Sequence, residues 1–335
     1  MAAELPIEGI LVGHYSDLEG LTGCTVVLAP LGVVASVDIR GGAPGTLETA
    51  LLSPYASVTE IHAILLTGGS APGLAAAAGV TAFLQENGYG YQTPFAKIPL
   101  VSAAVIYDLG LGSAQACPKP ADAYQAAVSA RSTVEEGSVG AGTGATVGKL
   151  FNFEGMMKGG VGLASVQIGG GVTVSALTVV NALGDVLDER GEILAGARRN
   201  GAFVGSKASL LAMDSAPVFG AIESTTLSVV MTDAALDKLQ CSIVARMAHD
   251  GMARAIDPVH TPRDGDCVFT MATGRRPGNV FQVGVAAADA VAASIRRAVW
   301  AAESLGGALS VSDLTVERGR RSAACPGSSG PGAAG

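Results

Sequence analysis

Short runs rich in valine and isoleucine, bounded by glycine, proline or polar residues, constrain the fold of this chain most strongly. The runs cover residues 24–28, 61–66, 100–107, 172–180, 227–231 and 267–272. Continuous apolar runs of this length are typical of strands buried on both faces. We therefore expect a sheet, or sheets, with covering layers on both sides.

Longer segments with helical spacing separate some of these runs. Residues 71–86 are alanine-rich and end near Asn87, and residues 281–304 carry a second apolar stripe. A third helical pattern follows Asp233, with Thr232 or Asp233 as its expected N-cap. Strands mixed with helices in this way predict a layered α/β or α+β fold.

Charge and cysteine usage exclude several classes of partner. The net charge is −8, from 21 basic and 29 acidic residues, and no basic stripe is present. We therefore expect no nucleic-acid partner and no anionic membrane partner, since both bind clustered Lys and Arg.

The five cysteines show no metal-type spacing, so we expect no disulfide framework and no metal. We also expect no cofactor. No signal peptide and no apolar run of spanning length is visible, which predicts a soluble, cytoplasmic protein.

Two stretches differ in composition from the expected core. Residues 135–148 are rich in Gly, Ser and Thr and read as a loop outside the core. Residues 319–335 are rich in Ser, Gly, Pro and Ala, and we expect them to form a disordered tail.

The first candidate for chemistry is Thr225, at the point where a polar patch enters a buried strand. Two threonines at the start of a strand are common, and composition alone favours that plain interpretation. If the bond before Thr225 is cut, however, the freed α-amine has a pKa of about 8 and can act as base for its own hydroxyl. Cleavage would then be the activating step.

Asp264 and Asp266 flank a glycine directly before a strand. Asp-Gly-Asp is an ordinary turn signal, and it also fits a weak cation site. Alternatively, a carboxylate near the nucleophile could orient an α-amine, keep it partly protonated or hold a lysine. Spacing alone favours the turn.

Lys149 follows a glycine-rich segment that superficially resembles a phosphate-binding loop. The glycine spacing of that motif is missing, and Leu150 stands where it requires Ser or Thr, so we reject a nucleotide site. The apolar Leu150 and Phe151 make a partly buried lysine plausible. Asn181 closes another apolar run, where it could form a turn or offer its amide to an oxyanion.

Taken in order, these segments resemble the self-processing L-aminopeptidase/D-esterase (DmpA-type) family, which includes β-aminopeptidases and nylon-oligomer hydrolases. The resemblance covers residues 5–315. It is carried by residues 13–14, 37–46, 66–71, 104–108, 140–149, 157–160, 179–181, 247–251 and 260–266.

This resemblance implies a four-layer αββα sandwich in one catalytic domain, residues 1–318, cut into fragments 1–224 and 225–335. It implies acyl transfer to Thr225 on amide substrates, and αβ heterodimers that assemble further as tetramers. The implied site residues are Thr225 as nucleophile, Lys149, Asn181 on the oxyanion side, the acidic pair Asp264 and Asp266, and Tyr107 in the pocket. Ser224 departs from the family pattern, in which Asn or Gly commonly precedes the nucleophile, and it is the alternative nucleophile.

Three functions stay open at this point. The first is an aminopeptidase or amidase acting on short peptides or amino-acid oligomers. The second is a hydrolase of ω-amino-acid oligomers of the nylon type, or of another special amide. The third, of a different class, is an inactive relative kept as a scaffold.

Overall fold

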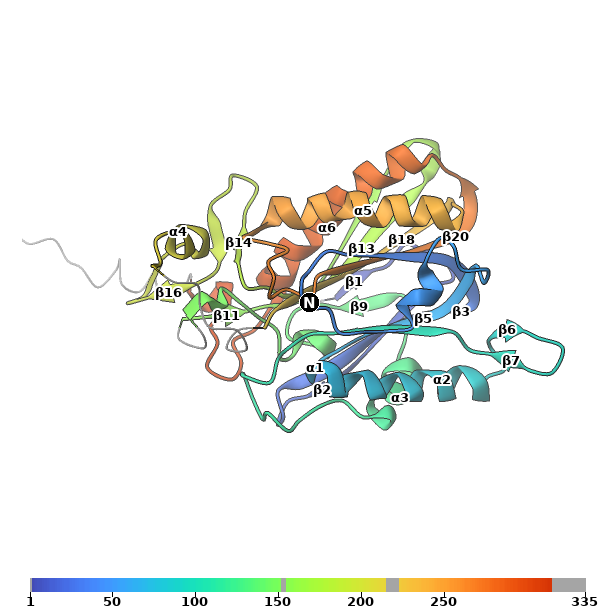
Figure 1. Cartoon of the computed structure of the whole chain (residues 1–335), viewed down its shortest axis with the longest axis horizontal. Helices are drawn as coiled ribbons and strands as arrows, with labels where there is room; N and C mark the ends of the chain where they lie inside the picture. Colours follow the sequence, from blue (N-terminus) through green and yellow to red (C-terminus); the bar gives the residue numbers. More distant parts are fainter. Residues whose placement is uncertain (1, 152–154, 215–222, 315–335) are drawn as a thin grey trace, which may run out of the picture.

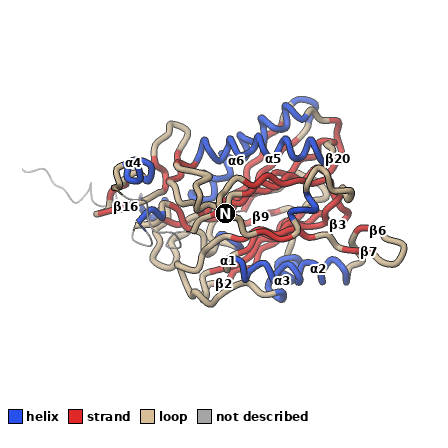
Figure 2. The backbone as a smooth tube through the Cα atoms, viewed as in Figure 1, coloured by secondary structure: helices blue, strands red, loops and turns tan. Residues whose placement is uncertain are grey.

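The computed structural model describes residues 2–151, 155–214 and 223–314. Within them the chain forms two layers of strands between two layers of helices (Figures 1 and 2). The expected tail at 319–335 lies outside the described residues.

One hydrogen-bonded sheet runs through both strand layers. Its strands lie in the order β12 (Gly160–Gln167), β13 (Thr173–Asn181), β18 (Thr225–Ala235), β20 (Cys267–Pro277), β3 (Thr22–Ile39), β5 (Glu60–Thr67), β8 (Val101–Val105) and β4 (Thr46–Leu47), and β2 (Leu11–Asp17) also pairs with β3. All six predicted strands are confirmed. The long strand β3 connects the layers: its first part pairs with β2 and β5, and its last part pairs with β20.

Helices cover both outer faces. On one side lie α5 (Lys238–Ala255) and α6 (Val280–Ala301), and on the other α1 (Ser70–Gly73), α2 (Ala77–Glu86) and α3 (Pro120–Val128) (Figure 1). A short helix, α4 (Ser206–Leu211), lies apart from both layers. The helices expected at 71–86 and 281–304 are confirmed, the first of them interrupted by the 3-10 turn Leu74–Ala76.

Three apolar clusters fill the spaces between the four layers. In β18, Val230 packs toward α5 and α6, whereas Leu227 and Val229 pack between the two strand layers. In β3, Val26 packs toward α2 and α3. This alternation follows from the two-residue period of a strand, and it explains why the runs are apolar at every position. The expected αββα sandwich is confirmed.

Small sheets and turns surround the sandwich. They are β1 (Ala2–Glu4) with β9 (Thr133–Glu135), β6 (Tyr91–Gln92) with β7 (Lys97–Ile98), β10 (Thr146–Val147) with β11 (Met157–Lys158), β16 (Arg198–Arg199) with β17 (Ala202–Phe203), and β14 (Asp185–Leu187) between β15 (Ile193–Ala195) and β19 (Ile256–Asp257). Further 3-10 turns cover Thr49–Leu52, Gly140–Gly142, Lys149–Phe151 and Gly169–Gly171.

The prediction that α5 begins at Thr232 or Asp233 is wrong. Strand β18 continues to Ala235 alongside β20, and the N-cap is Asp237, whose carboxylate accepts from the Gln240 amide at 2.8 Å. Pairing with a neighbouring strand outweighs the local capping signal here.

The prediction that residues 135–148 lie outside the core is wrong for most of that stretch. The glycine-rich loop at 140–149 is buried at every residue. Its glycines let the backbone pack closely: a Cβ on Gly142 would lie 2.6 Å from the Val161 nitrogen. Among the described residues, no helix is long and apolar enough to cross a membrane.

Candidate active site

The peptide bond between Ser224 and Thr225 lies at the start of β18, and both residues are buried. The amide of Ser224 donates to the carbonyl oxygen of Arg263 at 3.1 Å. The carbonyl oxygen of Ser224 accepts from the Gly265 amide at 2.8 Å and from Thr225 Oγ1 at 2.6 Å. The bond that the sequence predicts to be cut therefore carries two donors on its carbonyl, one of them the neighbouring hydroxyl.

Gly265 lies so close to Thr225 that no side chain fits there. A Cβ on Gly265 would lie 2.7 Å from Thr225 Oγ1 and 2.9 Å from the carbonyl oxygen of Ala43. Glycine thus lets a backbone N–H approach the Ser224 carbonyl while leaving space for the hydroxyl.

Asn181 is the direct partner of Thr225 in the antiparallel pairing of β13 with β18. Side chains at directly opposite positions lie on the same face of a sheet, with Cβ atoms about 4.5–5.5 Å apart. Two residues further along each strand, Val179 and Leu227 belong to the cluster between the strand layers. The side chains of Thr225 and Asn181 therefore face the end of the inter-layer space.

Lys149 reaches Asn181 from the buried glycine-rich loop. Lys149 Nζ donates to Asn181 Oδ1 at 2.6 Å and to the Asn181 carbonyl oxygen at 3.0 Å, and the Thr146 amide donates to the same Oδ1 at 3.1 Å. Asn181 Nδ2 donates to the Tyr107 carbonyl oxygen at 3.0 Å. Two donors on one side and an acceptor on the other fix the orientation of the amide. Tyr107 thus contributes its main chain to the site.

Burial lowers the pKa of Lys149 to about 7, although the nearby carboxylates of Asp264 and Asp108 oppose the shift. The Lys149 side chain is fully enclosed, with the residue 5% exposed. An amine with this pKa exchanges its proton near neutral pH, unlike a surface lysine.

The first carboxylate of the pair, Asp264, is buried and accepts two hydrogen bonds through Oδ2, from the Thr261 amide at 2.8 Å and from Thr261 Oγ1 at 2.6 Å. Burial, and next the charge of Asp266, raise the pKa of Asp264 to about 6, while Thr261 and Lys149 oppose the shift. Asp264 can therefore change its charge in the pH range in which Lys149 does.

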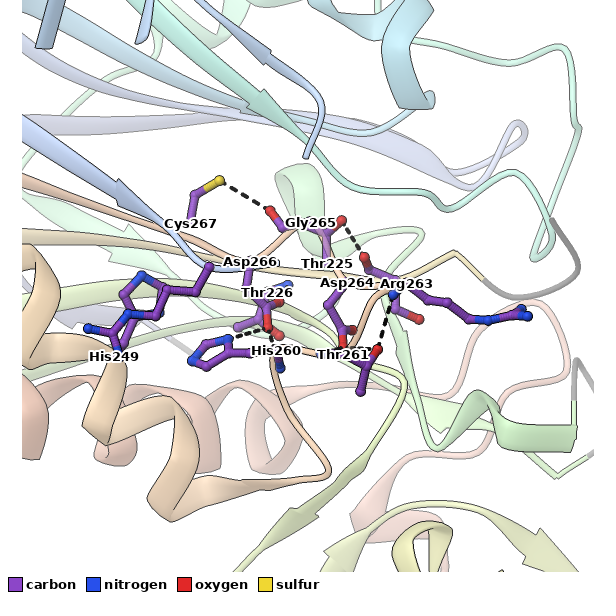
Figure 3. Close-up of polar contacts among 12 residues, drawn as sticks. Thr225, Thr226, His249, His260, Thr261, Arg263, Asp264, Gly265, Asp266 and Cys267 are labelled. Carbon is purple, nitrogen blue, oxygen red and sulfur yellow. Dashed lines mark hydrogen bonds and ion pairs between the residues drawn. The ribbon is translucent and has the colours of Figure 1, made fainter. Parts of the chain in front are cut away.

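The second carboxylate, Asp266, connects two segments. Its Oδ1 accepts from the Thr226 amide at 2.7 Å, and its Oδ2 accepts from the His260 amide at 3.1 Å and pairs with His260 Nδ1 at 2.8 Å (Figure 3). Asp266 thus contacts the residue that follows Thr225. The turn lies just before the Asp-Gly-Asp segment, where the Asp264 amide donates to the Thr261 carbonyl oxygen at 3.1 Å. The segment itself is extended, and Asp264 forms a bridge with Ser224, which brings both carboxylates to the start of β18.

Two buried charged residues that sequence reasoning did not single out also belong to this region. Asp108 accepts from Thr22 Oγ1 and from the Gly69 amide, each at 2.7 Å, and its charge acts on Lys149. Lys158 Nζ donates to two carbonyl oxygens of the glycine-rich loop, Gly142 at 2.9 Å and Ala145 at 2.7 Å. Burial raises the pKa of Asp108 and lowers that of Lys158 to about 7.

The signal for Asp108 was present in the sequence, because it follows an apolar strand as Asn181 ends one. Lys158 had a weaker signal, a lone lysine between apolar and glycine residues. Within the described ranges, no group of three or more His, Cys, Asp or Glu residues could hold a metal ion.

Known proteins resemble this chain over most of its length. The profile described as Peptidase family S58 matches residues 6–311. An uncharacterized aminopeptidase of Mycobacterium leprae is 40% identical, covering 90% of this chain and 91% of that protein. A 6-aminohexanoate-oligomer endohydrolase of Kocuria sp. is 35% identical, covering 79% of this chain and 73% of that protein.

Solved structures share the fold at lower identity. The l-aminopeptidase d-ala-esterase/amidase from Ochrobactrum anthropi, described as a new variant among the Ntn hydrolase fold, has a TM-score of 0.71 at 22% identity, over 96% of this chain and 94% of that one. A Burkholderia sp. beta-aminopeptidase has a TM-score of 0.67 at 22% identity, over 93% and 92%.

The four layers of this chain are thus those of the N-terminal nucleophile (Ntn) hydrolase fold. The chain belongs to peptidase family S58 and is a hydrolase of amide or peptide bonds.

Proposed function

We propose that the chain cuts itself between Ser224 and Thr225 and then hydrolyses amide bonds through the freed Thr225. The observation that carries this proposal is the pair of donors on the Ser224 carbonyl oxygen, Thr225 Oγ1 at 2.6 Å and the Gly265 amide at 2.8 Å. The hydroxyl lies beside the carbonyl that it would attack, and the amide is placed to stabilise the negative charge that forms on that oxygen.

The cleavage step is an acyl shift followed by hydrolysis. Thr225 Oγ1 attacks the Ser224 carbonyl carbon, the C–N bond breaks, and the proton of the hydroxyl passes to the leaving nitrogen of Thr225. Water then hydrolyses the ester, which leaves a carboxylate on Ser224 and a free hydroxyl and amine on Thr225. The products are fragments 1–224 and 225–335.

In the cut enzyme, the neutral α-amine of Thr225 is the general base for its own hydroxyl. The hydroxyl attacks the substrate carbonyl, the amine passes the proton to the leaving amine, and water releases the acyl group. Asn181 Nδ2 uses one hydrogen for the Tyr107 carbonyl, and we assign its second hydrogen to the substrate oxyanion. Burial of this space strengthens such a donor.

The charged residues around Thr225 set the proton balance of the site. Lys149 holds Asn181 and, with its pKa lowered to about 7, can accept or release a proton near neutral pH. Asp264 and Asp266 supply negative charge next to the new amine, which favours its protonated form and so tunes its pKa.

The substrates that we propose are short peptides or amino-acid oligomers. Oligomers of ω-amino acids are the second candidate, because a relative named 6-aminohexanoate-oligomer endohydrolase is 35% identical over 79% of this chain. A panel of p-nitroanilides, β-peptides and 6-aminohexanoate oligomers distinguishes the two. The highest kcat/KM on 6-aminohexanoate oligomers would select the second candidate.

A denaturing gel tests the self-cleavage itself. Wild-type protein should resolve into two fragments, and Thr225→Ala should stay as one inactive chain. Ser224→Ala should still be cut, because the proposal assigns the attack to Thr225. An uncut Ser224→Ala together with a cut Thr225→Ala would make Ser224 the nucleophile.

We further propose that residues 1–318 form one catalytic domain and that the two fragments stay together as αβ units. These units form tetramers, and the enzyme is cytoplasmic.

A further inference from the structure

Asp266 lies at the end of the loop that precedes β20, and it joins this loop to β18, the strand that begins with Thr225. Its Oδ1 accepts from the amide of Thr226, the residue after Thr225, at 2.7 Å. Its Oδ2 is held by His260, through the main-chain N–H at 3.1 Å and through Nδ1 at 2.8 Å. The Asp266 side chain is 1% exposed, so these donors replace the water that would otherwise solvate it.

His260 adopts a backbone conformation that suits this double contact. Its φ is +55°, in the left-handed region that non-glycine residues rarely adopt. Such a conformation costs conformational energy and persists where surrounding contacts determine it. In this conformation both the N–H and the ring of His260 reach the same carboxylate oxygen.

The contact with Asp266 fixes the role of His260 Nδ1. A carboxylate only accepts, so Nδ1 is the donor of this hydrogen bond. His260 Nε2 is buried and has no hydrogen-bond partner among the described residues, so the Asp266 carboxylate is the partner that orients the ring.

A second imidazole lies against the first. His249, on α5, is fully buried, and its ring is 4.7 Å from the ring of His260 in an edge-to-face arrangement (Figure 3). Its Nε2 lies 3.1 Å from the carbonyl oxygen of Asp38, which can only accept. Burial lowers the pKa of His249 to about 4, so this neighbour is neutral at neutral pH.

We propose that His260 is a positioning residue for Thr225, acting through Asp266. Its main-chain N–H and its Nδ1 hold the carboxylate against the start of β18, beside the amine that cleavage creates. This inference rests on the proposed function, because it assigns the purpose of Asp266 to the amine that cleavage creates.

Two substitutions at His260 test the side-chain donor separately from the left-handed backbone conformation. His260→Asn keeps an N–H donor near the position of Nδ1, and Asn tolerates positive φ; His260→Gly tolerates it too but has no side-chain donor. We expect His260→Gly to slow self-cleavage and to lower kcat of the cut enzyme by about 10- to 100-fold, with KM little changed, because the reacting groups lose their alignment. His260→Asn should restore both rates.

A stability control comes from His62, a buried histidine on β5 whose Nδ1 accepts from the Leu100 amide at 3.3 Å. His62→Ala should lower the melting temperature without a matching loss of kcat. If His260→Gly and His62→Ala lose activity in the same proportion to lost stability, or if His260→Asn is as slow as His260→Gly, the proposal is overturned.

Nitrogen NMR of the wild-type imidazoles tests the same idea without a variant. His260 should carry a hydrogen on Nδ1, and a ring protonated at Nε2 alone would contradict the proposal. The failures can be told apart. An intact, inactive wild-type chain would refute the proposed function, whereas a cut, active wild type with an equally active His260→Gly would refute only the role of His260.

Discussion

The amide of Gly265 donates to the carbonyl oxygen of Ser224 at 2.8 Å, although the two residues lie 41 positions apart in the chain. The contact exists because the loop before β20 forms a bridge with the residue that precedes β18. It places a backbone donor on the carbonyl of the Ser224–Thr225 bond, and a side chain at Gly265 would occupy the space beside Thr225 Oγ1.

Gly265→Ala should therefore impair self-cleavage. The added Cβ would lie 2.7 Å from Thr225 Oγ1, so the hydroxyl or the backbone donor has to move. We expect processing to slow by about 10²–10³, the usual cost of losing an oxyanion donor. Gly169→Ala is the matched control, since nothing lies within 4 Å of a Cβ there. Time courses on denaturing gels measure both, and equal rates for the two variants would contradict the role of Gly265.

Asn181→Ala should lower turnover of the cut enzyme by about 10²–10³ through loss of the oxyanion donor. It also removes an acceptor from Lys149 Nζ, so we expect a stability loss of about 1–3 kcal/mol as well. Asn279→Ala, which removes the N-cap of α6, should cost about 1 kcal/mol without the loss of turnover. A processed, folded Asn181→Ala variant with near-normal kcat would exclude the oxyanion role.

Lys149 should make stability depend on pH. Its folded-state pKa is about 7, against an ordinary 10.5, so between these values the unfolded chain binds more protons and stability rises with pH. In the uncut Thr225→Ala background, Lys149→Met should flatten the rise between pH 7.5 and 10 by up to about 1.4 kcal/mol per pH unit. Chemical denaturation at several pH values measures this slope. An unchanged slope would mean that Lys149 keeps an ordinary pKa in the folded protein.

Asp266→Asn should shift the pH dependence of activity. The negative charge of Asp266 favours the protonated Thr225 amine and raises its pKa, whereas activity needs the neutral amine. Removing the charge should move the acidic limb of kcat/KM to lower pH, and Asp264→Asn should act in the same direction. The charge of Asp266 contributes to raising the pKa of Asp264, so each limb reports the cluster as a whole.

That measurement uses protein that is already cut. Asp289→Asn is the control, because Asp289 is exposed and pairs with Arg254 on the outer helices. If the limb stays in place in both Asp266→Asn and Asp264→Asn, neither carboxylate senses the amine.

Local patterns predicted much of the site because apolar runs end in polar residues there. Thr225 and Asn181 each stand at an end of such a run, and the structure pairs them across two neighbouring strands. Asp108 carries the same signal and could have been found in the same way. The start of α5 was misjudged because Thr232 and Asp233 are good caps, yet their strand continues beside β20.

Other features depend on contacts between distant segments and leave no local signal. The need for glycine at 265 arises from the approach of two backbones, and the burial of Lys158 arises from carbonyl oxygens of the glycine-rich loop. The contact of His260 with Asp266 requires a positive φ that its sequence neighbours do not indicate. Contacts of this kind become visible only when the folded chain brings the segments together.

Intact-mass analysis of the purified wild-type protein, combined with N-terminal sequencing of its smaller fragment, tests the central claim most directly. Two masses are expected, corresponding to residues 1–224 and 225–335, with Thr225 as the first residue of the second fragment and activity rising in proportion to the cut fraction. A fully active preparation that consists only of the uncut chain would contradict it, because the nucleophile would then have no free amine.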